Sequence, residues 1–338
     1  MLTEKENYMM LLNGEQPEWI PLYSLMPMPG KITPTQMFEP PFLVPHRVNM
    51  GKPGKDVWGV PYVPTYETGE ALIPEPNKFI LKDIRKWRDV IKAPSIEGID
   101  WEKMAKKHIE DGKIDRTQTA LALNLHFGYF QHLMSFMGFS EGLAAMFEEP
   151  DEVMELFEYI CDFFIAVAEK VIDHYDPDIL TFMDDTAAWG ASFISPKMYK
   201  EMLVPFHDRW AKIGRDRGLK MTMHNCGKCE DILDYLVEMG ISLWEPAQTC
   251  NDLVAVKAKY GSKLAVCGGW DGRGRLLDPD VTDEEIYAAV EATFEKYAKG
   301  GGYAFCGGFL GPLDDENVKR KNKALNAAVE KLSRTFYS

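Results

Sequence analysis

One histidine and two cysteines provide the side chains that could bind a metal ion. His224 and Cys226 are one residue apart at the end of the apolar run 219–223, and Cys306 ends a second short run, 303–306. On an extended strand, side chains i and i+2 point to the same side, so His224 and Cys226 can face one ion. Three protein ligands of mixed nitrogen and sulfur type are typical of catalytic zinc, which keeps one position open. A buried histidine with two core cysteines fits the same pattern, and both interpretations remain open at this point.

The elements that position these residues alternate between strands and helices. Predicted strands cover residues 120–125, 178–183, 219–223, 241–244, 264–267 and 303–306, with helices between them. Ser195-Pro196 is typical of a helix N-cap followed by proline at the first helical position. Thr282-Asp283-Glu284-Glu285 predicts a capping box. This alternation is typical of parallel β/α units.

Two further runs, 20–25 and 113–118, bring the number of strands to that of a closed barrel. We therefore predict an α/β fold, a (β/α)8 TIM barrel, formed by a single domain over residues 1–338. Residues 26–80 are rich in proline and glycine, which predicts an irregular N-terminal insertion or lid with a small hairpin around Trp58-Gly59-Val60. The glycine motifs of dinucleotide-binding sheets and P-loops are absent from the sequence.

Polar residues collect at the carboxyl ends of the predicted strands, where TIM barrels carry out their chemistry. They are Asn124, His126, Asp184, Asp185, His224, Cys226, Glu245, Cys267 and Cys306. Adjacent strand residues face opposite sides, so one of the two aspartates should point into the mouth. We predict Asp184 as a catalytic acid and Asp185 as a substrate-binding residue; support of a metal ligand and an N-cap are the alternatives. Tyr23, Asn124, His126 and Trp189 are further candidates for substrate contacts, although each also fits a structural role.

The bulk composition limits the class of partner. The 338 residues include 52 acidic and 38 basic side chains, which gives a formal net charge of −14. This excess argues against nucleic acid and against a polybasic contact with a membrane. No apolar run approaches the roughly 18 residues that span a bilayer, and the sequence has no signal-peptide h-region. We expect a cytoplasmic protein with free thiols.

Four segments together form a recognisable pattern: Ile194-Ser195-Pro196, Pro205-Phe206, the run 218–227 that contains His224-Asn225-Cys226-Gly227, and Cys306-Gly307-Gly308. These segments resemble the uroporphyrinogen decarboxylase-like superfamily and, within it, the zinc-dependent corrinoid methyltransferases. The resemblance covers residues 120–335 well and the first hundred residues weakly.

Within this resemblance, His224, Cys226 and Cys306 match the zinc ligands of the methyltransferase branch. Glu245 stands where thiol-methylating relatives have a carboxylate ligand, which implies a fourth ligand that leaves during catalysis; a rim glutamate paired with lysine or arginine is the alternative. Cys229 follows Cys226 by three residues, and we expect it to point away from the metal at the start of a helix. The implied cofactors are Zn²⁺ and a corrinoid, cobalamin, carried by a partner protein.

The N-terminal residues 1–8 and the aromatic, methionine-rich segment up to residue 66 resemble O-demethylase methyltransferases. Such enzymes move a methyl group from a small methoxylated aromatic substrate to Co(I) of a corrinoid protein. Relatives that methylate a thiol such as coenzyme M use the same zinc ligands, so that alternative stays open. Decarboxylases of the superfamily bind substrate carboxylates through an arginine-rich motif, and the matching stretch 25–30 has no arginine. A non-catalytic barrel that binds a corrinoid protein or a tetrapyrrole is a further alternative, and either a monomer or a homodimer is compatible with the resemblance.

Overall fold

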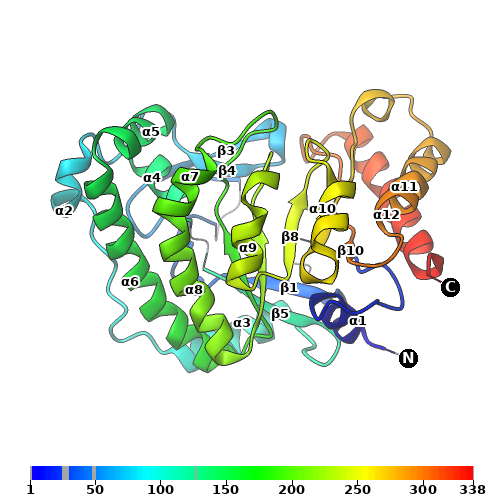
Figure 1. Cartoon of the computed structure of the whole chain (residues 1–338), viewed down its shortest axis with the longest axis horizontal. Coiled ribbons are helices and arrows are strands. Elements are labelled where there is room, and N and C mark those ends of the chain that lie inside the picture. The colour runs from blue at the N-terminus through cyan, green and yellow to red at the C-terminus, as the bar shows by residue number, and fades with distance from the viewer. Residues whose placement is uncertain (1, 25–29, 48–50, 126–127, 338) are drawn as a thin grey trace.

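A curved parallel sheet forms the centre of the protein (Figure 1). The computed structural model describes residues 2–24, 30–47, 51–125 and 128–337. Among them the sheet has seven strands, in the spatial order β1 (Thr35–Phe38), β5 (Ala120–Asn124), β6 (Ile179–Met183), β7 (Lys220–His224), β8 (Leu243–Ala247), β9 (Ala265–Gly268) and β10 (Tyr303–Ala304). Every neighbouring pair is parallel, so the carboxyl ends of all seven strands meet at one edge.

Helices connect the strands and cover the outer face of the sheet. They are α2 (Trp87–Val90), α3 (Trp101–Gly112), α4 (Tyr129–Met137), α5 (Phe139–Glu148), α6 (Pro150–Tyr175), α7 (Pro196–Met198), α8 (Val204–Arg217), α9 (Leu233–Met239), α10 (Leu253–Tyr260), α11 (Asp283–Tyr297) and α12 (Glu316–Thr335). In α6 the buried residues Val153, Leu156, Phe157, Ile160 and Phe164 recur every three or four positions, which is the apolar stripe of an amphipathic helix. None of the described helices is both long enough and apolar enough to cross a membrane.

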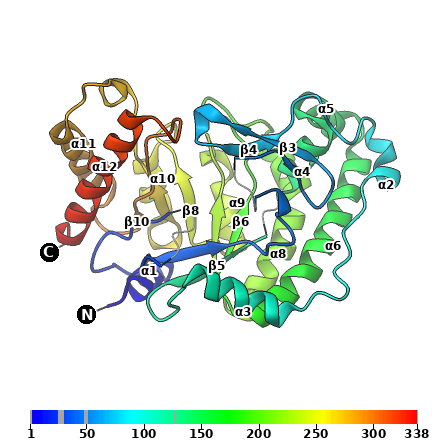
Figure 2. The same ribbon diagram turned by 180° about the vertical axis from the view of Figure 1, so that it is seen from behind.

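Helix α1 (Glu4–Leu12) closes the sheet at the edge opposite the carboxyl ends of its strands (Figures 1 and 2). Its Tyr8, Leu11 and Leu12 pack in one buried cluster with inward-facing strand residues such as Leu243 and Cys267. The backbone N–H of Lys5 donates to the carbonyl oxygen of Gln118 at 2.8 Å, just before β5 begins. The interior of the curved sheet is therefore filled by side chains at its amino end, which leaves the carboxyl end for a site.

The proline-rich segment near the N-terminus folds as a small antiparallel sheet. It consists of β2 (Gly54–Lys55), β3 (Pro61–Thr65) and β4 (Ala71–Pro74). The Asp56 carboxylate accepts the backbone N–H groups of Trp58 and Val60, both at 2.9 Å, and so forms the turn between β2 and β3. The β3–β4 hairpin lies at the edge of the molecule that holds the carboxyl ends of the strands (Figure 2). Tyr66 Oη donates to Asp314 Oδ1 at 3.0 Å, which joins this hairpin to the loop after Cys306.

Most predicted strands are confirmed, with end shifts of one to three residues, but the predicted strand 113–118 is wrong. Lys113 ends α3 in a left-handed conformation and Asp115 accepts turn hydrogen bonds, so this stretch is a loop. The strand that occupies its place is β1, from within the proline-rich segment. Near residue 22 the chain forms a single parallel bridge to Phe305, where Tyr23 N–H donates to the Phe305 carbonyl at 2.8 Å. The described strands thus give a parallel α/β fold of the TIM-barrel type with a seven-stranded sheet, rather than a complete ring of eight.

Both predicted helix caps are confirmed, and one predicted helix is interrupted. Thr282 and Glu285 form the reciprocal capping box of α11, and Ser195 Oγ accepts the Met198 N–H before α7. The helix expected to follow Ser195 without a break contains a π-helical segment at Tyr199–Leu203 before α8 starts. The interruption directly precedes Pro205, which lacks the N–H that a continuous α-helix would use.

Asn7 should contribute to stability through its buried amide. Its Nδ2 donates to the Trp19 carbonyl at 3.0 Å and its Oδ1 accepts the Glu18 N–H at 2.8 Å, so it joins α1 to the segment that leads to Tyr23. Asn7→Ala should lower the free energy of unfolding by about 1–3 kcal/mol, since it leaves these backbone groups without partners. Asn13→Ala, at the exposed end of the same helix, is the matched control. Urea unfolding curves of the metal-free protein measure both, and equal values would contradict the assignment.

Candidate metal centre

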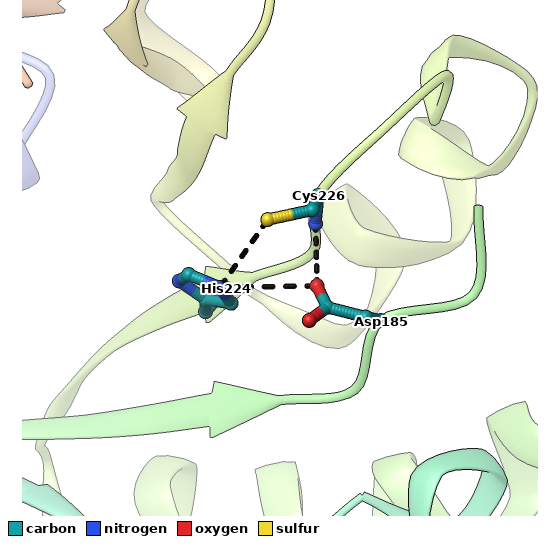
Figure 3. A group of neighbouring side chains, drawn as sticks. All are labelled: Asp185, His224 and Cys226. Atoms are coloured by element: carbon teal, nitrogen blue, oxygen red, sulfur yellow. Dashed lines mark hydrogen bonds and ion pairs between the residues drawn. The ribbon is translucent and has the colours of Figure 1, made fainter. Parts of the chain in front are cut away.

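Three side chains converge at the carboxyl ends of β6 and β7 (Figure 3). The ligand atoms of Asp185, His224 and Cys226 all lie within 4.8 Å of one another. His224 Nε2 is 3.6 Å from Cys226 Sγ and 3.8 Å from Asp185 Oδ1. Atoms bound tetrahedrally to one zinc ion at ~2.0–2.3 Å are roughly 3.3–3.8 Å apart, so this donor set fits zinc in both type and spacing.

Asp185 is held in place by two donors. Its Oδ1 accepts the backbone N–H of Cys226 at 2.6 Å, and its Oδ2 accepts from Gln131 Nε2 at 3.1 Å. Gln131 belongs to α4, so the carboxylate joins three separate segments of the chain. Asp185 lies within reach of an ion shared with His224 and Cys226, and its expected role in substrate binding stays a prediction.

Glu245 contacts Nδ1 of His224, whereas Nε2 of the same ring faces Cys226 and Asp185. Its Oε2 is 2.9 Å from His224 Nδ1, while its Oε1 accepts a hydrogen bond from Tyr23 Oη at 3.0 Å. A carboxylate facing Nδ1 places a proton there and leaves the Nε2 lone pair for a metal. In this geometry Glu245 fixes the orientation of the His224 ring, and its expected role as a fourth ligand stays a prediction. Glu245 is 1% exposed and Tyr23 is also buried, and the expected contact of Tyr23 with substrate stays a prediction.

The surroundings of the centre favour the protonated forms of the His224 imidazole and the Cys226 thiol. Burial opposes a charged imidazole, yet the Glu245 carboxylate and hydrogen bonds to Cys226 and Glu245 raise the pKa of His224 well above its usual value. Burial raises the pKa of the Cys226 thiol, against a hydrogen bond to His224 that lowers it. Metal binding must therefore displace protons from Nε2 and Sγ, which is the usual linkage at zinc sites.

The turn after β7 explains the spacing of the His-Asn-Cys-Gly motif. Asn225 is fully buried; its Oδ1 accepts the Thr186 N–H at 3.0 Å and its carbonyl accepts the Trp244 indole N–H at 2.9 Å. Gly227 has φ +87°, and a Cβ there would lie 2.6 Å from the Ala187 carbonyl oxygen. Sequence reasoning missed Asn225 and Gln131 as supporting residues. The signal for Asn225 was its position between two candidate ligands, whereas nothing in the sequence joins Gln131 to Asp185.

The other cysteines lie outside this group of three. Cys229 is buried and its Sγ donates to the Cys226 carbonyl at 3.1 Å, in agreement with the expectation that it points elsewhere. Cys306 follows β10 and contacts the Cys267 thiol in the interior of the sheet. Among the described residues, the candidate group for a metal contains Asp185 in the place where Cys306 was expected. The role of Cys306 as a ligand stays a prediction.

Asp184 points away from the converging ligands into a buried network. It is fully buried, its two oxygens accept the N–H groups of Phe130 and Gln131 at 3.2 and 3.0 Å, and its Oδ2 is 3.2 Å from His207 Nε2. Asp184 therefore joins the start of α4 to α8 behind the site. This placement favours a structural role, and catalysis by Asp184 stays an untested prediction.

The remaining candidate residues are spread around the mouth. Asn124 is buried and its Nδ2 donates to Met37 Sδ at 3.1 Å and Glu39 Oε1 at 3.3 Å. Trp189 is 41% exposed and stacks against Arg273, whose guanidinium carbon is 3.9 Å from the ring centroid. His126 lies outside the described residues. Trp189 thus offers a partly exposed aromatic surface, and its expected contact with substrate stays a prediction.

Comparison with known structures supports the fold. The geometry defines a parallel α/β protein of the TIM-barrel type with a candidate metal centre at the carboxyl ends of its strands. A methyltransferase from Methanosarcina mazei aligns over 100% of both chains with a TM-score of 0.62 and 14% sequence identity, which shows a shared fold. D-psicose 3-epimerase from Clostridium cellulolyticum H10, solved with D-tagatose, aligns over 70% of this chain and 84% of its own at 14% identity and a TM-score of 0.37, too low to support any conclusion.

Comparison with protein families is more specific. The family model for uroporphyrinogen decarboxylase (URO-D) matches residues 126–319, which is more than half of the chain. The chain therefore belongs to the uroporphyrinogen decarboxylase family. A search of curated proteins finds no match.

The two adjacent aspartates should respond differently to the same substitution. Asp185→Asn should weaken zinc binding by at least about 10-fold because it removes a charged oxygen from the centre, with little change in stability. Asp184→Asn should lower the free energy of unfolding by about 3 kcal/mol, since an amide nitrogen cannot accept the buried N–H groups. Chelator competition measures the first effect and urea unfolding of the metal-free proteins measures the second. The reverse pattern would exchange the roles assigned here.

Proposed function

We propose that this protein is a zinc-dependent methyltransferase that moves a methyl group from a small methoxylated aromatic substrate to Co(I) of a corrinoid protein. The convergence of His224, Cys226 and Asp185 at the carboxyl ends of two neighbouring strands carries this proposal. Membership of the URO-D family and a fold shared with a methyltransferase support it. Cys306 follows β10, which pairs with the strand that holds Cys267, and we propose it as a further ligand of the ion.

The chain's own residues would hold and orient the reacting groups. His224 Nε2, Cys226 Sγ and Asp185 Oδ1 would bind the ion, and Glu245 and Gln131 would keep two of these ligands in position. When bound, zinc supplies Lewis acidity that stabilises the negative charge developing on the ether oxygen. The methyl carbon leaves without the electron pair of its C–O bond, and Co(I) of the partner protein donates the pair for the new bond. The aromatic face of Trp189 at the mouth offers a surface for the substrate ring.

The arginines near the mouth disfavour the thiol-methylating alternative. A sulfonated thiol such as coenzyme M needs an unpaired cation. Arg273 makes two hydrogen bonds to Asp271, from Nε at 2.7 Å and Nη2 at 2.6 Å, while Arg275 contacts Asp278, Asp280 and Glu285. Arg273 and Arg275 are therefore both already paired with carboxylates.

We further infer that the chain is one domain in which the segment at Leu22 completes a barrel of the (β/α)8 type beside β10. The antiparallel sheet β2–β4 would then act as a lid over the mouth. The bond from Tyr66 to Asp314 supports this role, because it couples the hairpin to the loop that carries Cys306.

The first experiment measures zinc content and methyl transfer in the same samples. Wild-type protein should hold about one zinc per chain and form methylcobalamin from a methoxylated aromatic and Co(I)-cobalamin. His224→Ala and Cys226→Ser should lose the metal and slow methyl transfer by about 100-fold or more. Cys306→Ser tests the remote ligand in the same way.

Cys229→Ser is the matched control, since it changes a thiol in the same turn that lies outside the converging group. It should retain both zinc and activity. Stoichiometric zinc with thiol methylation and no ether turnover would favour the alternative acceptor. Absence of zinc from the wild-type protein would overturn the proposal.

A further inference from the structure

Two buried tyrosines approach Glu245 from the N-terminal part of the chain. Tyr8 lies on α1 and Tyr23 on the extended segment beside β10, and both are packed in the cluster inside the sheet. Tyr23 Oη donates to Glu245 Oε1 at 3.0 Å. Tyr8 Oη is also buried, but it has no hydrogen-bond partner among the described residues. The two hydroxyl groups therefore share an environment and differ in whether they bind the carboxylate.

The hydrogen bond from Tyr23 has a fixed direction. Burial raises the pKa of Tyr23 well above its usual value, and the neighbouring Glu245 raises it further, so the phenol stays protonated. A neutral hydroxyl beside a carboxylate donates its proton. The other oxygen of Glu245, Oε2, is 2.9 Å from His224 Nδ1. Each oxygen of Glu245 thus has one partner, and the carboxylate is held at both ends.

We propose that Tyr23 is a positioning residue of the metal centre, which acts through Glu245 to present His224 Nε2 to the ion. Without the hydroxyl, Glu245 Oε1 would lose its hydrogen-bond donor beside the buried cluster that contains Tyr23, Leu243 and Cys267. A buried carboxylate with one free oxygen gains by turning toward another donor. Such a rotation would withdraw Oε2 from Nδ1 and release the ring of His224. The inference rests on the metal centre of the proposed function and does not depend on the methyl donor or acceptor.

The pairing of strands explains why the two oxygens of Glu245 are bound by residues from distant parts of the chain. His224 and Glu245 are direct neighbours in the register of β7 and β8, so their side chains meet without help. Tyr23 arrives from beyond β10, where its N–H donates to the Phe305 carbonyl at 2.8 Å. It therefore reaches Glu245 Oε1 from a segment beside the last strand of the sheet, whereas His224 contacts Oε2 from β7. A hydroxyl at this position is the donor that the described neighbours provide for Oε1.

The test compares zinc affinity in Tyr23→Phe and Tyr8→Phe, measured by competition with a chromophoric chelator. Both changes remove one hydroxyl from the same buried interior, but only the first removes a bond to Glu245. Tyr23→Phe should weaken zinc binding by about 10-fold, the lower end of the effect of outer-shell partners. Tyr8→Phe should leave the affinity unchanged. In a Glu245→Gln background, Tyr23→Phe should add nothing further, because the residue through which it acts is already altered.

A second readout uses the metal-free proteins. Nitrogen-15 spectra report the His224 Nδ1 proton, and its hydrogen-bonded signal should weaken in Tyr23→Phe and persist in Tyr8→Phe. Equal zinc affinities in the wild type and Tyr23→Phe, or equal losses in both tyrosine variants, would overturn the inference and leave the proposed function intact. Wild-type protein without zinc would instead contradict the proposed function, and the nitrogen-15 comparison would then decide the role of Tyr23. A further loss of affinity from Tyr23→Phe in the Glu245→Gln background would also count against action through Glu245.

Discussion

The buried carboxylate of Glu245 is the interaction on which the geometry of the centre depends. An ionised carboxylate in a dry interior costs several kcal/mol unless it is paired and hydrogen-bonded. Glu245 is 1% exposed and satisfies this requirement through His224 on β7 and Tyr23 beside β10. The cost of leaving the charge unpaired therefore fixes two side chains from distant parts of the chain. Orientation of the histidine ring follows from electrostatics in the interior rather than from the histidine's own backbone.

The register of the parallel sheet supplies the remaining convergence. Met183, His224 and Glu245 are successive neighbours across β6, β7 and β8, so the residues that follow these positions leave the sheet at the same level. Asp185 and Cys226 each lie two residues beyond a member of this row. Their contact, a 2.6 Å hydrogen bond from the Cys226 N–H to Asp185 Oδ1, adds to the hydrogen bonds between Asn225 and Thr186 that join the same two loops. The candidate metal centre at this edge is thus positioned largely by the register of the sheet.

Sequence reasoning recovered the local features and missed those that depend on contacts between distant segments. The strands around His224 and Glu245 were predictable because each is a short apolar run with turn residues on both sides, and the capping box of Thr282 lies within four residues. Strand β1 was missed because its four residues lie among prolines and become a strand only by pairing with β5. The i, i+2 rule placed His224 and Cys226 together, yet it could not tell which aspartate faces them. The position of Glu245 at a strand end was visible in the sequence, but its contact with His224 Nδ1 could be seen only in the structure.

The bridge between Leu22 and Phe305 has a consequence for how the chain folds. Segments separated by nearly the whole chain must meet before Tyr23 can take its place, and contacts of such long sequence separation form slowly because the loop between them must first be closed. During synthesis, the start of the chain leaves the ribosome long before residue 305 has been added. The strands from β5 to β9 can pair in the order in which they emerge, but Glu245 keeps an unbound oxygen until the last strand arrives. Completion of the centre is therefore a late event, and a chain truncated before Phe305 would retain His224, Cys226 and Asp185 without the bridge that brings Tyr23 to Glu245.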